Sequence, residues 1–170
     1  EYLEEVFPTP SLLGATPRET AHIRTIARVG DIYILNNMFM LSGQSRAETR
    51  NQGIIDLLGG QVVRNIKALN RMIGQDGFAC SSRLTLADCA LVPALFMVEN
   101  VLPSTGMEDP IPKAAHVAAY WAAIQQNEHA ARTLVELHRG LEERREMIRN
   151  GTFAKLMAKA AAAMAEAEKD

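Results

Sequence analysis

The sequence has few cysteines and almost no charge imbalance, and each of these shortages excludes a class of protein. Its 170 residues include two cysteines, Cys80 and Cys89, whose spacing fits neither a zinc site nor a redox motif. Free thiols are therefore expected, as is usual in cytosolic proteins. A net charge of −2 argues against a surface for nucleic acid. No alternation of apolar and polar residues stands out, so we predict no β-strands.

Long hydrophobic runs and metal-ligand patterns are also missing. The apolar run at residues 90–98 is too short to cross a bilayer, and residues 1–5 lack the basic and apolar parts of a signal peptide. We therefore predict no membrane partner and a cytoplasmic location. The four histidines show no metal-ligand spacing and no paired carboxylate, so we predict no metal site and assign no catalytic residue.

What the sequence does contain is a strong helix start at Thr85. Asp88 follows three residues later, so the two residues can form a capping box in which each side chain serves the backbone of the other. The residues after the cap have no polar face, which is typical of a helix that is buried on all sides. We predict that this helix is the centre of a soluble helical core.

Further helical patterns surround this one. Thr16 and Glu19 form a second capping box and predict a helix from Pro17 to about Leu41. A third box at residues 45–48 predicts a helix that ends near residue 74, with apolar residues at helical spacing. Later patterns predict a helix that contains Trp121, another that is capped by Asn127, and an alanine-rich tail after residue 151. The fold class is therefore all-α, a helical bundle around the helix that starts at Thr85.

This order of elements resembles a known family. The sequence EYLEE at residues 1–5 is followed by a Pro-Leu-Leu linker, a long capped helix, a glycine-bearing helix and LTLADCAL at residues 84–91, and Trp121 lies in the next helix. The set is similar to the C-terminal helical domain of cytosolic bacterial glutathione S-transferases, over roughly residues 1–146. Residues 31–37 also resemble their counterpart in zeta-like and related bacterial members.

The resemblance implies a domain organisation. Residues 1–15 would be the end of the last helix of a thioredoxin-like domain and a linker, residues 16–150 the helical domain, and residues 151–170 a helical tail. In the family the thioredoxin-like domain precedes the helical one and binds glutathione. It is absent from this sequence, so we expect this chain alone to lack the glutathione site. The intact parent is expected to be a homodimer that transfers glutathione to a small hydrophobic electrophile, or isomerises or reduces it.

Candidate site residues lie on the first long helix. Tyr33 and Asn37 are four residues apart on one ridge, with Leu41 one turn further, and the family's equivalent helix lines the electrophile pocket. The alternative is that Tyr33 and Asn37 are hydrogen-bonded core residues. In several glutathione transferases an aspartate near the position of Asp31 reaches the glutathione amine of the partner subunit, and its carboxylate suits an ammonium. Asp88 is interpreted as a cap and not as a catalytic carboxylate.

Two other functions stay open on the sequence alone. The chain could be a glutathione-transferase-like module that binds or assembles without catalysis. It could also be a helical interaction domain that has lost the upstream half. Turnover and glutathione binding by the intact gene product would separate the enzyme from the first alternative, and the genomic sequence just before residue 1 would test the second.

Overall fold

A computed structural model describes residues 2–167, and within that range it contains helices and no strand. The chain divides into two compact units, residues 1–134 and 135–170. The all-α fold expected from the sequence is confirmed.

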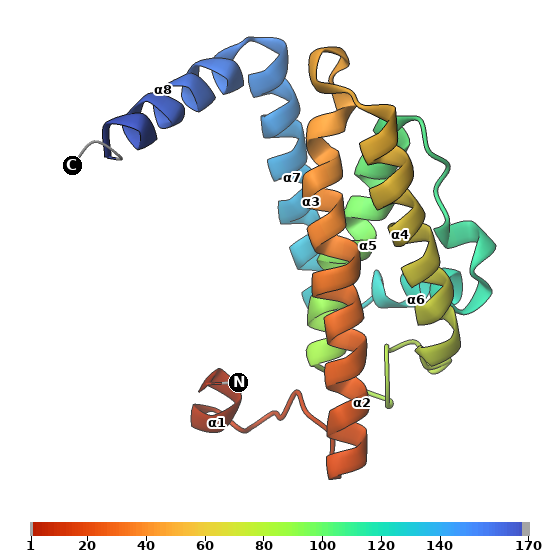
Figure 1. The fold of residues 1–170 in the computed structure, drawn as a ribbon. Coiled ribbons are helices and arrows are strands. Elements are labelled where there is room, and N and C mark those ends of the chain that lie inside the picture. The colour runs from red at the N-terminus through yellow and green to blue at the C-terminus, as the bar shows by residue number, and fades with distance from the viewer. Residues whose placement is uncertain (1, 168–170) are drawn as a thin grey trace. The chain divides into compact units, whose positions relative to one another are not determined.

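The first long helix of unit 1 is a continuous rod made of three segments. Helix α2 (Pro17–Arg28) leads into a π-helix (Val29–Leu35), which leads into α3 (Asn36–Ser42). Figure 1 shows α2 and α3 in line, with α4 beside α3. At the start, the Glu19 backbone N–H donates to the Thr16 hydroxyl at 3.2 Å, and the Ala15 N–H donates to the Glu19 carboxylate at 2.9 Å. The predicted helix and its cap at Thr16 are therefore confirmed, but the capping box differs from the prediction because the Glu19 carboxylate bonds the N–H of Ala15 and not that of Thr16. The π-helix was not foreseen.

The next helix starts later than the sequence indicated. Residues 43–45 and 47–49 form short 3-10 helices, and α4 runs from Gln52 to Met72. The prediction of a capping box at residues 45–48 is wrong, because Ser45 ends one 3-10 helix and the next has Arg46 as its N-cap, with no side-chain hydrogen bond. The actual cap is Asn51, whose side-chain oxygen accepts from the Ile54 N–H at 3.2 Å.

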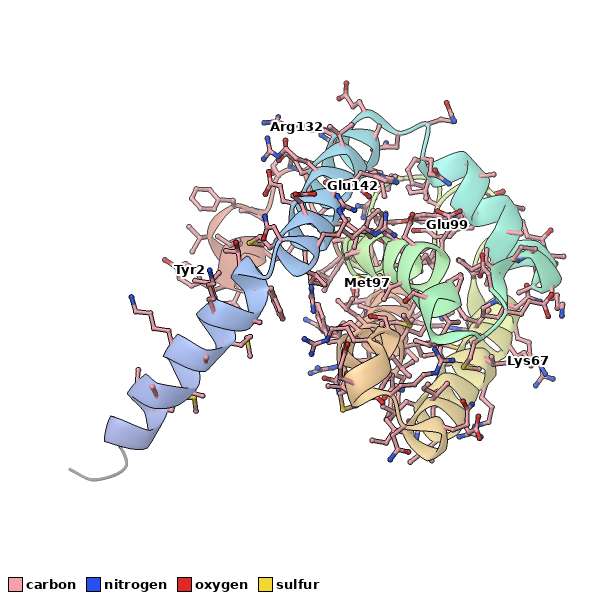
Figure 2. The ribbon with its side chains drawn as sticks, turned by 90° about the horizontal axis from the view of Figure 1, so that it is seen from above. Tyr2, Lys67, Met97, Glu99, Arg132 and Glu142 are labelled. Carbon is pink, nitrogen blue, oxygen red and sulfur yellow. The ribbon has the colours of Figure 1, made fainter. Side chains whose placement is uncertain are left out.

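Helix α5 (Leu86–Val101) is the core of unit 1, and nine of its residues are buried. Its capping box forms as predicted. The Asp88 carboxylate is 0% exposed and accepts from the Thr85 N–H and the Thr85 hydroxyl, each at 2.8 Å. It also accepts from the Ala79 N–H at 2.8 Å, so it fixes the preceding loop as well as the helix start. Viewed from above in Figure 2, α5 is enclosed by the rod, α4 and α6.

The expectation that this apolar segment is too short for a membrane has to be corrected. With the turn that follows α5, the helical stretch Leu86–Thr105 has 20 residues and a mean hydropathy of 1.5, which is long and apolar enough to cross a bilayer. The sequence estimate stopped at the polar residue Glu99, whereas the helix continues past it. More than half of the stretch, 56%, is buried inside the protein, as in the core helix of a globular domain.

The chain returns to this core through two 3-10 helices (Leu102–Thr105 and Ile111–Lys113) and helix α6 (Ala115–Ile124). The indole N–H of Trp121 on α6 donates to the Glu99 carboxylate on α5 at 3.1 Å. Helix α7 (Glu128–Arg149) then begins in unit 1, and the Asn127 side chain accepts from the Ala130 N–H at 3.3 Å, as predicted for its cap.

Hydrogen bonds connect the first helix to the linker, and the linker to the residues at the start of α5. Helix α1 (Tyr2–Val6) supplies Glu4, whose carboxylate accepts from the Leu12 N–H at 3.0 Å. The Leu12 carbonyl in turn accepts from the Leu86 N–H at 2.9 Å. The guanidinium of Arg83 donates to the carbonyls of Ser11 and Leu13. The linker therefore has a defined course over unit 1.

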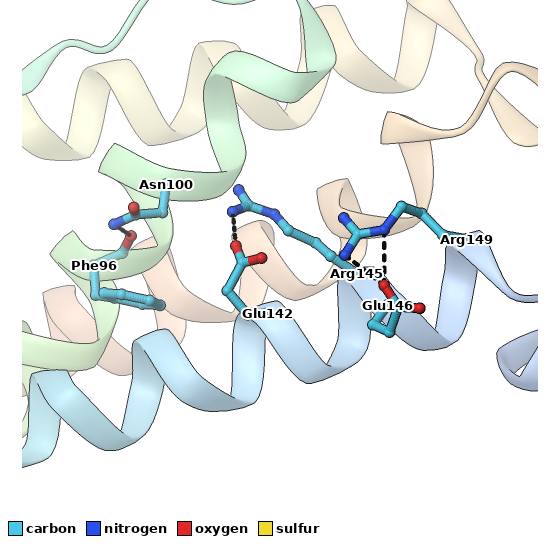
Figure 3. Close-up of polar contacts among 6 residues, drawn as sticks. All are labelled: Phe96, Asn100, Glu142, Arg145, Glu146 and Arg149. Carbon is cyan, nitrogen blue, oxygen red and sulfur yellow. Dashed lines mark hydrogen bonds and ion pairs between the residues drawn. The ribbon is translucent and has the colours of Figure 1, made fainter.

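Unit 2 consists of the rest of α7 and helix α8 (Thr152–Ala167). Figure 3 shows two ion pairs along α7, Arg145 with Glu142 at 2.5 Å and Arg149 with Glu146 at 2.6 Å. The same figure shows a bond within unit 1, in which the Asn100 amide donates to the Phe96 carbonyl of its own helix, α5. The mixed-charge run at residues 142–146 is largely exposed. Helix α8 forms as predicted, and its large apolar side chains Leu156, Met157 and Met164 are exposed.

Candidate functional site

The predicted site residues lie on the rod, from the π-helix to the end of α3. Asp31 and Tyr33 are exposed, and Tyr33 has 53% of its surface accessible. Asp31 makes a long ion pair with Arg28 at 3.9 Å, and both side chains are open to solvent. Such an exposed pair contributes little to stability, so the Asp31 carboxylate is available to a ligand.

Asn37 and Leu41 are buried. Leu41 is 0% exposed and belongs to the core, and Asn37 is 5% exposed. The Asn37 amide donates to the Tyr33 carbonyl at 2.8 Å and to the Gln61 side-chain oxygen at 3.2 Å. Asn37 is therefore a hydrogen-bonded core residue, while Tyr33 is not in the core. The structure brings Tyr33 and Asn37 together through the Tyr33 backbone, and their binding roles stay predictions.

A polar cluster on α4 supports this part of the rod. The Asn65 amide donates to the Gln61 carbonyl at 2.8 Å and to the Tyr33 carbonyl at 3.3 Å. The Tyr33 carbonyl therefore accepts from Asn37 on its own rod and from Asn65 on the neighbouring helix. Gln61 and Asn65 were not predicted as site residues. The available signal was two amide side chains four residues apart on one helix.

The other side of the π-helix is packed against α5. Gly30 is buried, and a Cβ atom placed there would lie 3.1 Å from a Leu91 methyl carbon and 3.3 Å from the Ala90 backbone. A side chain at this position would push the two helices apart. Gly30 thus permits a close approach of the π-helix to the central helix, while Asp31, Ile32 and Tyr33 are exposed.

The remaining reactive groups do not form an obvious catalytic centre. Cys80 is buried and Cys89 is exposed beside a largely apolar cavity of about 180 Å³ at the start of α5. Burial raises the pKa of both thiols, which disfavours their nucleophilic forms at neutral pH. Within the described residues, no group of three or more metal-ligating side chains is found.

Comparison with known proteins agrees with this architecture. Residues 52–123 match the family model described as "Glutathione S-transferase, C-terminal domain". Over 128 residues the chain is 32% identical to a maleylacetoacetate isomerase from Pseudomonas aeruginosa, a match that covers 74% of this chain and 60% of the relative. A crystal structure of a glutathione S-transferase from Methylobacterium radiotolerans, in complex with glutathione sulfonate, superposes with a TM-score of 0.66 at 18% identity, over 78% of this chain and 62% of the other.

The fold and these matches define unit 1 as an all-helical domain of the glutathione S-transferase C-terminal type. Unit 1 therefore contains a domain of the glutathione S-transferase C-terminal family, as the resemblance in the sequence implied. The matched region spans about three fifths of the length of each of the two relatives.

Proposed function

We propose that this chain supplies the second-substrate half of a glutathione-dependent isomerase whose substrate is maleylacetoacetate or a close analogue. The observation that carries the proposal is the 32% identity to a maleylacetoacetate isomerase over 128 residues. This activity narrows the broader expectation of glutathione transfer, isomerisation or reduction of a small electrophile. Glutathione would be held mainly by a thioredoxin-like domain and would supply the thiol.

In this proposal the rod forms one wall of the substrate site. Tyr33 offers an exposed ring and a hydroxyl to the substrate, and the buried side chains of Asn37 and Leu41 fix the shape of the rod beneath it. Asp31 would receive the glutathione amine of the partner subunit in a homodimer, because a solvent-facing carboxylate suits an ammonium group.

The dimer itself is supported by exposed apolar side chains on two adjacent elements. Large apolar residues of the rod and of α4 are accessible over at least 40% of their surface: Ile32, Phe39, Met40, Ile54 and Leu57. Several large apolar side chains exposed on neighbouring elements are typical of an interface between proteins. We further propose that the protein works in the cytoplasm and without a nucleic-acid or membrane partner.

The test is an assay of the product of the complete reading frame that encodes this chain. We expect glutathione-dependent loss of maleylacetoacetate, followed by absorbance, and binding of glutathione by titration calorimetry. Glutathione binding without turnover of this or any other electrophile would favour the non-catalytic module. Failure to bind glutathione at all would contradict the proposal and favour a helical interaction domain.

The proposed role of Asp31 has its own test. Asp31→Asn in the complete protein should raise KM for glutathione about fivefold or more, because a charge-assisted hydrogen bond to the amine is lost. Asp56→Asn is the matched control, since Asp56 is an exposed carboxylate that accepts from Gln52 at 2.8 Å on α4. Equal KM values for the two variants would remove Asp31 from the site.

A further inference from the structure

The π-helix in the middle of the rod is held by side chains that come from a different helix. Its closing backbone bond runs from the Asn36 N–H to the Asp31 carbonyl, five residues back. Such wider turns are rare and are frequent at functional sites. A π-turn needs contacts that favour it over the α-helix on either side. Here those contacts are the close packing of Gly30 on α5 and the polar cluster around the Tyr33 carbonyl.

That cluster is a closed ring of hydrogen bonds. The Asn37 amide joins the Tyr33 carbonyl to the Gln61 side chain, and the Asn65 amide joins the same carbonyl to the Gln61 backbone. Both amides therefore use two acceptors each. Asn65 is 32 residues from Tyr33 in the sequence, so the bond between them ties α4 to one peptide group of the π-helix.

The fixed peptide group determines which side chains face outward. Ile34, next to Tyr33, is 0% exposed, whereas Ile32 and Tyr33 are 44% and 53% exposed. If the π-turn relaxed toward an α-helix, every residue on one side of it would rotate relative to the other side. The Tyr33 ring would then leave its present direction even though the rod remained helical.

We propose that Asn65 is a positioning residue, which acts with Asn37 to hold the π-helix so that Tyr33 faces the second substrate. The proposal rests on the function proposed above and assigns to α4 a part in substrate recognition. Asn65 does not itself contact the substrate in this scheme. Its effect passes through the Tyr33 peptide group.

The kinetic test uses the complete protein and the variants Asn65→Ala, Tyr33→Ala and the double variant. Asn65→Ala should lower kcat/KM for the second substrate about fivefold to tenfold, the equivalent of one lost hydrogen bond, and leave KM for glutathione unchanged. The same change in the Tyr33→Ala background should have no further effect, and Asn65→Gln, which keeps the donor, should restore part of the activity. Equal losses in both backgrounds, or an unchanged kcat/KM, would overturn the proposal.

A control separates positioning from general stability. Gln125→Ala removes the same type of bond, from a side-chain amide to the carbonyl four residues earlier, on α6, where Gln125 donates to Trp121 at 3.1 Å. It should lower the melting temperature by no more than Asn65→Ala, which loses a second bond to the Tyr33 carbonyl, and leave the kinetics unchanged. If Gln125→Ala lowered kcat/KM as much as Asn65→Ala, the effect would be one of stability and the proposal would fail.

Amide hydrogen exchange on the 170-residue chain provides a readout that does not depend on activity. Asn65→Ala should increase exchange at residues 29–38 and leave α6 unchanged. Unchanged exchange at residues 29–38 would show that Asn65 does not hold the π-helix, whatever the enzyme does. A complete protein that shows the exchange effect and turns over no substrate would instead contradict the proposed function, and the substrate-facing role of Tyr33 would be rejected with it.

Discussion

Replacing Asp88 with alanine should destabilise unit 1 far more than the same change in an exposed capping box. The carboxylate accepts three hydrogen bonds at 2.8 Å and is fully buried. Its removal leaves the buried N–H groups of Ala79 and Thr85 without an acceptor, and each orphaned donor costs about 1–3 kcal/mol. The Thr85 hydroxyl can rotate toward another acceptor. We therefore expect a loss of roughly 3–5 kcal/mol, a large fraction of the stability of an ordinary domain.

The matched control is Glu19→Ala in the capping box of α2. Glu19 accepts from the Ala15 N–H at 2.9 Å, and this bond is exposed. Water can replace the lost acceptor, so the expected cost is about 1 kcal/mol or less. Both variants can be followed by urea denaturation, with the fluorescence of Trp121, the single and buried tryptophan, as the probe for unit 1. If Asp88→Ala cost no more than Glu19→Ala, the buried network would not be what anchors α5.

Three further predictions concern separate parts of unit 1. Gly60→Ala should raise the free energy of unfolding by about 0.5–1 kcal/mol, because a Cβ there meets nothing within 4 Å and alanine favours the helix; an unchanged urea midpoint would contradict this. Hydrogen bonds from the Ser11 hydroxyl and the Leu12 N–H lower the pKa of the Glu4 carboxyl below its ordinary value of 4.5, so the linker contact is lost only as the pH falls through the lowered pKa. The NMR shift of the Leu12 amide should therefore titrate with a midpoint below pH 4.5, and a midpoint above 4.5 would refute the assignment. Iodoacetamide at pH 8 should modify Cys89 before Cys80, both more slowly than a free cysteine, and mass spectrometry would detect the reverse order.

The parts of the fold that could be predicted are those set by local chemistry. Thr85 and Asp88 sit three residues apart before an apolar run, and that pattern by itself specifies the start of the central helix. The equally good local pattern at residues 45–48 gave a wrong prediction, because Ser45 lies in a 3-10 helix and α4 starts only after Asn51. Local signals of equal strength can therefore differ in outcome when the backbone around one of them takes another conformation.

The candidate site was less predictable because its geometry depends on distant residues. Tyr33 and Asn37 could be selected from their spacing, and the structure joins them through the Tyr33 carbonyl. The π-helix that contains Tyr33 shifts the register, and no periodicity in this mostly apolar segment reveals such a shift. The support from Asn65 comes from another helix, and a single sequence does not show which helix faces which.

The composition of the central helix has a consequence for how the protein is made. The stretch Leu86–Thr105 would be prone to aggregate if it emerged from the ribosome before any other helix, since it has the length and hydropathy of a membrane segment. Synthesis from the N-terminus delivers the rod and α4 first, so the surfaces that cover this stretch already exist when it emerges. The order of the helices therefore gives this stretch a partner to pack against as soon as it emerges.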